Sequence, residues 1–221
     1  MTRPLKGQQW PVWDWPVRLT HWFFVFAVAA MWWTGESGLF EWHSKLGYVI
    51  LTLVVTRLLW GFVGSHHARF GNFVRGWSVI KRYLQSPTAS VGHNPLGALS
   101  VIALLGVLLF QGISGLFSND DIAFDGPLSY LAGVYSHTIT ALHQGSWMVL
   151  QGLILLHIGA VLFYQWRKKQ PILQAMLHGM AEGKFSETPP VSILRWVTLV
   201  VLVAIVLSSL LWLAPSPPAY Y

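Results

Sequence analysis

Five long apolar stretches dominate this chain of 221 residues and limit what it can fold into. They lie at about residues 17–35, 44–64, 96–117, 145–165 and 194–213. A helix needs roughly 20 mostly apolar residues to cross the hydrocarbon core of a membrane, and each stretch is long enough. Hydrophobic residues make up 54% of the chain and charged residues only 10%, which is too little polar surface for an ordinary soluble domain. The sequence therefore predicts an all-α bundle of transmembrane helices.

The charged residues between these stretches predict how the bundle is oriented. Basic residues predominate at 1–18, 65–94 and 167–169, whereas the segments at 36–41 and 120–125 are acidic. Because loops rich in Lys and Arg stay in the cytoplasm, we expect a cytoplasmic N-terminus and a periplasmic C-terminus in a bacterial inner membrane. The net charge of +6 is then a topology signal, and we expect no nucleic-acid partner.

We also expect three parts along the chain, and the grouping of the first four stretches as one core is what the family resemblance given below implies. We expect a four-helix core at residues 1–166 and a basic cytoplasmic linker at 167–193. An additional transmembrane helix follows at 194–213, with a short periplasmic tail to residue 221. We expect contact with membrane lipid throughout, and the oligomeric state, including a homo-oligomer, stays open.

The chain contains no cysteine, and this limits its metal chemistry. Disulfides, iron–sulfur clusters held by thiolates and covalently attached c-type haem all need cysteine. Any metal or cofactor must therefore be held by histidine, methionine or oxygen ligands.

Four of the nine histidines lie in or at the edge of apolar stretches: His21, His43, His143 and His157. Ionisable groups at such depths are costly and usually functional. His143 and His157 are 14 residues apart, so they share one helix face and are separated along it by roughly 21 Å. The predicted orientation puts His21 and His157 on the cytoplasmic side and His43 and His143 at the outer edge.

Two levels with two histidines each are what bis-imidazole haem ligation requires. Neutral imidazoles from facing helices bind the iron axially, and the porphyrin fills the apolar gap between the helices. We therefore expect His21 and His157 to hold an inner haem and His43 and His143 an outer haem. A single histidine in a span is as often a satisfied core residue, so the interpretation depends on four at matched depths.

Two arginines near the inner pair are candidates for binding haem propionates. Arg18 lies one turn before His21, and Arg57 lies near the cytoplasmic end of the second stretch. Both could equally be flanking charges that reach toward the membrane surface. Two interpretations are also open for three glycines in the apolar stretches, Gly47, Gly112 and Gly115. The missing side chain could let a flat macrocycle approach the backbone, or it could serve ordinary helix packing.

The remaining histidines are less informative, and we expect them to be solvated loop residues. His66, His67, His93 and His178 fall in predicted cytoplasmic loops, and His66 and His67 could form a surface metal site only with a further ligand. His137 lies in the outer loop and is the main rival of His143 for the outer haem. We prefer His143 because it shares a helix face with His157.

Several motifs around these residues are similar to a known family. They are Trp-Asp-Trp-Pro-Val-Arg-Leu-Thr-His-Trp at 13–22, His-Ser-Lys-Leu-Gly-Tyr at 43–48, Arg-Leu-Leu-Trp-Gly-Phe-Val-Gly at 57–64, Ala-Arg-Phe at 68–70, Gly-Ile-Ser-Gly-Leu-Phe-Ser-Asn-Asp-Asp at 112–121 and Asp-Gly-Pro-Leu at 125–128. Together with the paired histidines of the fourth stretch, they resemble the bacterial cytochrome b561 family, in particular the branch that includes the b-type cytochrome subunit of nickel–iron hydrogenase.

The resemblance implies a four-helix core with two haem b groups at the four histidines. It also implies electron exchange between a periplasmic redox protein and membrane quinone, with a c-type cytochrome or a hydrogenase-like iron–sulfur subunit as partner. The stretch at 194–213 is an addition to that core. Neither the direction of electron flow nor the quinone site follows from the sequence, so classification as a quinone-linked oxidoreductase stays open.

Three other functions compete with this interpretation. Some family members are associated with oxidation of superoxide at the outer face, with quinone as acceptor. A histidine-lined metal or proton transporter would need intramembrane carboxylates, and no stretch has Asp or Glu near its middle. A membrane anchor without a cofactor would leave four matched histidines unexplained.

Overall fold

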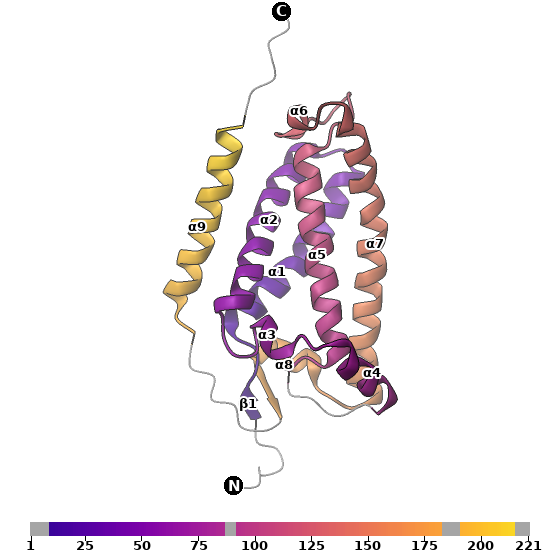
Figure 1. Cartoon of the computed structure of the whole chain (residues 1–221), viewed down its shortest axis with the longest axis vertical. Coiled ribbons are helices and arrows are strands. Elements are labelled where there is room, and N and C mark those ends of the chain that lie inside the picture. Colours follow the sequence, from indigo (N-terminus) through magenta and orange to yellow (C-terminus); the bar gives the residue numbers. More distant parts are fainter. Residues whose placement is uncertain (1–8, 87–91, 183–190, 215–221) are drawn as a thin grey trace, which may run out of the picture. The chain divides into compact units, whose positions relative to one another are not determined.

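The computed structural model describes residues 9–86, 92–182 and 191–214 and is mainly helical (Figure 1). The long helices are α1 (Trp15–Glu36), α2 (Phe40–Val63), α5 (Pro95–Phe117), α7 (Ser136–Leu162) and α9 (Ile193–Trp212). A π-helical turn, η2 (Phe163–Arg167), continues α7. The short helices are α3 (Phe70–Phe73), α4 (Trp77–Gln85), α6 (Ser129–Ala132), the 3-10 turn η1 (Gly133–Tyr135) and α8 (Ile172–His178).

Four helices in the described part of the chain are long and apolar enough to cross a membrane. They are α2, α5, the continuous helical segment Ser129–Arg167 that contains α7, and α9. The predicted all-α membrane bundle is thus confirmed. Helix α1 has 22 residues but is not among the four, because Arg18, His21 and its four tryptophans lower its mean hydropathy. A fifth span at 17–35 stays a prediction.

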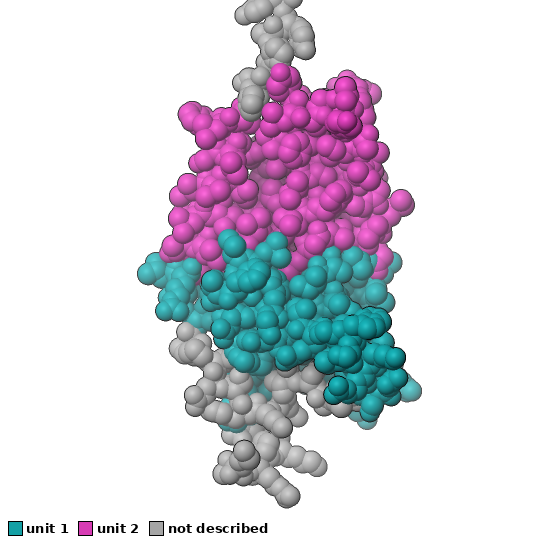
Figure 2. Space-filling view, in the orientation of Figure 1, with its two compact units in different colours: residues 1–22, 57–104, 153–195 teal, residues 23–56, 105–152, 196–221 magenta. Residues whose placement is uncertain are grey.

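The chain forms two compact units (Figure 2). Unit 1 comprises residues 1–22, 57–104 and 153–195, and unit 2 comprises residues 23–56, 105–152 and 196–221. Unit 1 includes α3, α4, α8 and two short strands, β1 (Gln9–Pro11) and β2 (Met180–Glu182). The strands pair antiparallel, with Trp10 opposite Ala181. The segment expected to be a linker at 167–193 therefore contains α8 and β2, which pairs with the strand before α1.

Asp14 organises the start of α1 within unit 1. Its Oδ1 accepts a hydrogen bond from the backbone N–H of Val17 at 2.8 Å, which is the usual contact of a helix N-cap. Its Oδ2 accepts a hydrogen bond from the indole Nε1 of Trp60 at 3.0 Å. Trp60 belongs to α2 and is only 4% exposed. One carboxylate thus caps α1 and satisfies a buried donor of α2.

Replacing Asp14 by Ala should lower the free energy of unfolding by about 2 kcal/mol, because it removes a helix cap and leaves a buried indole N–H without an acceptor. Thermal unfolding of the purified protein in detergent measures the change. Glu36→Ala is the matched control, because Glu36 is an exposed acid at the other end of α1. Equal stability of the two variants would contradict this role of Asp14.

Candidate functional site

Two histidine pairs are brought together, one in each unit. In unit 2, His43 of α2 and His143 of α7 have ring centres 6.4 Å apart, with an angle of 78° between the ring planes. In unit 1, His21 of α1 and His157 of α7 have ring centres 6.3 Å apart, at an angle of 54°. These are the pairings expected from the sequence.

The backbone of α1 determines which nitrogen of His43 is free. Its Nδ1 lies 3.0 Å from the carbonyl oxygen of Met31. Because a carbonyl only accepts hydrogen bonds, Nδ1 must carry the proton, and Nε2 keeps its lone pair for a metal. Gly35 makes room for the ring, since a Cβ there would lie 3.3 Å from it. A protonated Nδ1 held by a carbonyl is typical of metal-binding histidines.

Ser114 of α5 determines which nitrogen of His143 is free, as the Met31 carbonyl does for His43. The Ser114 hydroxyl donates to the carbonyl oxygen of Phe110 at 2.6 Å, so its lone pair is left to accept from Nδ1 of His143 at 2.9 Å. Gly115 lies against the same ring, and a Cβ at that position would come within 3.2 Å of Cε1. His143 is therefore also oriented with Nε2 available for a metal.

The pair in unit 1 is held less tightly. Nδ1 of His157 lies 3.4 Å from the Ser100 hydroxyl, which is a long contact. Nδ1 of His21 is buried without a hydrogen-bond partner among the described residues, and its ring meets the edge of Trp22 at 5.2 Å. The two pairs thus differ in the hydrogen bonding that surrounds them.

The separation within each pair fits one metal between two imidazoles. An imidazole nitrogen binds a metal at about 2 Å and the ring centre lies about 1.2 Å beyond it, so two imidazoles on opposite sides have centres about 6.4 Å apart. No group of three or more histidines and carboxylates that could hold a metal ion occurs among the described residues. A haem iron, which takes only two axial protein ligands, fits this donor set.

Each of the two candidate arginines has one buried N–H group that lacks a hydrogen-bond acceptor among the described residues. Arg57 is only 6% exposed, stacks its guanidinium 5.5 Å above the Phe70 ring, and has an Nη1 without a hydrogen-bond partner in the described part of the chain. Arg18 donates from Nη1 to the carbonyl oxygen of Leu177 at 2.5 Å, while its Nε is buried and unpaired there. Unpaired buried N–H donors are costly, and an anionic propionate would satisfy them.

The glycines singled out in the sequence have different surroundings. A Cβ at Gly112 would lie 2.9 Å from the side chain of Leu51, so this glycine allows α5 to pack closely on α2. A Cβ at Gly47 would meet Met31 at an ordinary 3.7 Å. Of the three glycines, only Gly115 touches a histidine of a pair.

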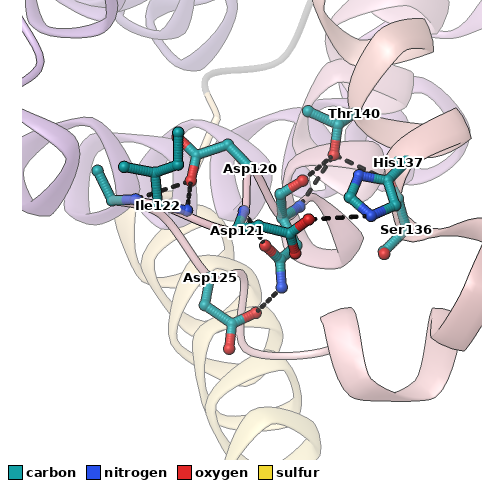
Figure 3. Close-up of polar contacts among 9 residues, drawn as sticks. Asp120, Asp121, Ile122, Asp125, Ser136, His137 and Thr140 are labelled. Atoms are coloured by element: carbon teal, nitrogen blue, oxygen red, sulfur yellow. Dashed lines mark hydrogen bonds and ion pairs between the residues drawn. The ribbon is translucent and has the colours of Figure 1, made fainter.

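His137, the rival of His143, lies elsewhere. Its exposed ring contacts Asp121 with 3.1 Å between Nε2 and Oδ2 (Figure 3). In the same loop, Asp120 accepts three backbone hydrogen bonds, which lower the pKa of its carboxyl group. His137 therefore belongs to the polar network of the loop at 119–125, and the ring facing His43 is that of His143.

The expectation that His93 is a solvated loop residue is wrong. Its ring packs 4.3 Å from the ring of Phe73 and 4.5 Å from the edge of Trp13, and its Nδ1 is buried without a hydrogen-bond partner in the described residues. Burial, and secondarily the charge of Arg57, lowers the pKa of His93 to about 3. The signal was the next residue, Asn94, whose side chain caps α5 at Gly97 N and so places His93 beside a helix start.

Comparison with known proteins agrees with the resemblance seen in the motifs. Residues 12–179 match the family described as prokaryotic cytochrome b561, so α9 lies outside the match. No solved structure matches the chain significantly.

Curated relatives carry the name probable Ni/Fe-hydrogenase B-type cytochrome subunit. The protein from Rhizobium leguminosarum is 25% identical over 80% of this chain and 90% of its own length. The protein from Escherichia coli K12 is 25% identical over 80% of this chain and 92% of its own length. The protein from Azotobacter vinelandii is 24% identical over 76% of this chain and 86% of its own length. The chain therefore belongs to the prokaryotic cytochrome b561 family, as a multi-pass b-type membrane cytochrome with haem b as cofactor and electron transfer as its function.

Proposed function

We propose that this chain holds two haem b groups and relays electrons between a periplasmic redox protein and the membrane quinone pool. The observation that carries the proposal is the presence of two histidine pairs with ring centres 6.3 and 6.4 Å apart, one in each unit. His43 and His143 would hold the outer haem, and His21 and His157 the inner one.

Haem b supplies reversible one-electron transfer at its iron when it is bound. The chain orients the axial ligands, neutralises charge and tunes the redox potential. Met31 and Ser114 accept hydrogen bonds from the Nδ1–H groups of the outer pair, which makes those imidazoles stronger electron donors and favours the oxidised iron. Arg18 and Arg57 would bind propionates of the inner haem and favour the reduced iron through their charge.

These contacts support a direction for the electrons. Strong hydrogen bonding should lower the potential of the outer site, and nearby arginine charge should raise that of the inner site. Electrons then flow downhill from the periplasmic side toward the cytoplasmic side, where quinone would accept them. Superoxide oxidation at the outer face would use the same downhill path, and no contact among the described residues favours it over a protein donor.

The names of the relatives support a partner. Because they are called cytochrome subunits of Ni/Fe hydrogenase, a hydrogenase-like iron–sulfur subunit is the preferred electron donor, ahead of a c-type cytochrome. The charge pattern supports an inner-membrane orientation with the N-terminus in the cytoplasm and the C-terminus in the periplasm. The end of the family match at residue 179 supports a four-helix core within 1–166, to which α9 is added after the segment at 167–193.

Single substitutions should remove one haem at a time. His157→Ala should lower the haem content from two to one per chain and abolish fast reduction by a quinol, because it removes an axial ligand of the inner site. His43→Ala should also leave one haem, but with reduction by quinol retained. Pyridine haemochrome assay and stopped-flow reduction by decylubiquinol measure the two quantities. His137→Ala is the control and should keep both haems; loss of both haems from each folded ligand variant would refute the pairing.

The hydrogen bond from His143 to Ser114 gives a finer test. Ser114→Ala should weaken binding of the outer haem by about 10-fold and raise its midpoint potential, because Nδ1–H loses its acceptor. Ser146→Ala is the matched control, since the Ser146 hydroxyl donates only to the backbone oxygen of His143. A redox titration followed in the visible spectrum compares them. Identical potentials in the two variants would count against the role of Ser114.

A further inference from the structure

A cavity of about 510 Å³ lies in unit 1, in the segment that joins the end of α2 to the start of α5. It is bordered by α3, α4 and the residues before α5. Its lining includes Arg75, Arg82, His67, His93, Asn72 and Tyr83. None of these residues belongs to the four histidines assigned to the haems, so the cavity needs an explanation of its own.

The charge around this cavity is of one sign. The segment at 64–94 contains four Arg or Lys residues and no Asp or Glu. Two of the four, Arg75 and Arg82, line the cavity, whereas Arg69 and Lys81 do not. Arg75 donates from Nη2 to the backbone oxygen of Asn72 at 2.8 Å and keeps its other N–H groups for a ligand. A cavity with two guanidinium groups and no acid suits an anion.

Two imidazoles in the lining have buried nitrogens without a partner. His67 Nε2 and His93 Nδ1 are both covered, and neither has a hydrogen bond within the described ranges. Burial lowers the pKa of both groups, so both rings are neutral at pH 7 and can each donate one N–H. Unsatisfied buried polar groups are rare in proteins, but these two nitrogens are covered by protein atoms, so they do not themselves identify the occupant of the cavity.

Helix α4 connects the cavity to the membrane surface. Its Ile80 and Tyr83 are buried, while Trp77 and Leu84 are exposed by 73% and 58%. An amphipathic helix with exposed apolar residues and basic neighbours is typical of the lipid–water interface. Since α2 and α5 are both candidate spans, the segment between them must lie at the surface that their ends reach. The phosphate groups closest to such a site are those of lipids.

We propose that this cavity binds the phosphate of an anionic phospholipid, with Arg75 and Arg82 as charged partners. Basic pockets beside transmembrane helices are suited to anionic lipid headgroups, and each basic residue adds to the attraction. A quinone is neutral and would not need two guanidinium groups. The proposal goes beyond the haem relay and does not depend on it.

Two double variants test the site at equal charge. Arg75→Gln with Arg82→Gln removes both cavity arginines, and Arg69→Gln with Lys81→Gln removes two charges of the same segment outside the cavity. The full-length protein is purified in detergent, delipidated and titrated with vesicles of phosphatidylcholine with or without 20% phosphatidylglycerol, and native mass spectrometry counts retained lipid. We expect the cavity variant to bind phosphatidylglycerol about 10- to 30-fold more weakly, and the control to resemble the wild type.

The other outcomes would overturn the proposal in distinguishable ways. Equal weakening in both variants would mean general surface charge. If inorganic phosphate alone binds as tightly as the lipid, the ligand is a free anion. Haem loss from the cavity variant would assign the cavity to the inner haem, and a raised KM for quinol with unchanged lipid binding would assign it to quinone.

A second variant keeps the test valid if the cavity variant does not fold, as judged by its haem spectrum and melting temperature. Val79→Trp fills the cavity from α4 without changing any charge. It should lower the count of retained phosphatidylglycerol as the arginine substitutions do. Full retention of lipid by this variant would contradict binding inside the cavity.

Discussion

An imidazole in an apolar helix is costly unless its ring nitrogens have partners, and the contacts of unit 2 supply partners for both Nδ1 atoms of its histidine pair. The Met31 carbonyl takes the Nδ1 proton of His43, and the Ser114 hydroxyl accepts that of His143. Both rings are thereby left with a lone pair on Nε2, which a metal or a hydrogen-bond donor can satisfy. The two ring centres lie 6.4 Å apart, a separation that one metal between them would fit.

Close contacts join the helices within each unit. Gly35 and Gly115 leave room for the two rings, and Gly112 lets α5 approach α2 closely. At the start of α1, Asp14 joins the helix to Trp60 of α2, and α8 is joined to α1 through Arg18. Two of these contacts, through Gly35 and Asp14, link α1 to α2, and both of these helices carry a histidine of a pair. Among the short helices, α8 is joined to α1 by the hydrogen bond from Arg18 to Leu177, while the long helices carry the paired histidines.

The pairing of the histidines could be predicted from the sequence because it depends on few quantities. The interval of 14 residues in α7 and the alternation of basic and acidic loops were enough to match His21 with His157 and His43 with His143. The partners of the rings could not be predicted, because Met31 acts through its backbone and Ser114 through a tertiary contact. Asn94 could have indicated that His93 stands before a helix, but the burial of His93 could not be predicted, because Phe73 and Trp13 are distant in sequence. The helices α3 and α8 are too short for apolar periodicity to reveal them.

The most direct measurement is the haem stoichiometry and spin state of the purified wild-type protein. Two ferric low-spin signals in the electron paramagnetic resonance spectrum, with two haem b per chain by chemical assay, are the predicted result. They would match two sites that each bind iron through two imidazoles. A single haem per chain, or high-spin iron with an open axial position, would contradict the assignment of His21, His43, His143 and His157 as two ligand pairs.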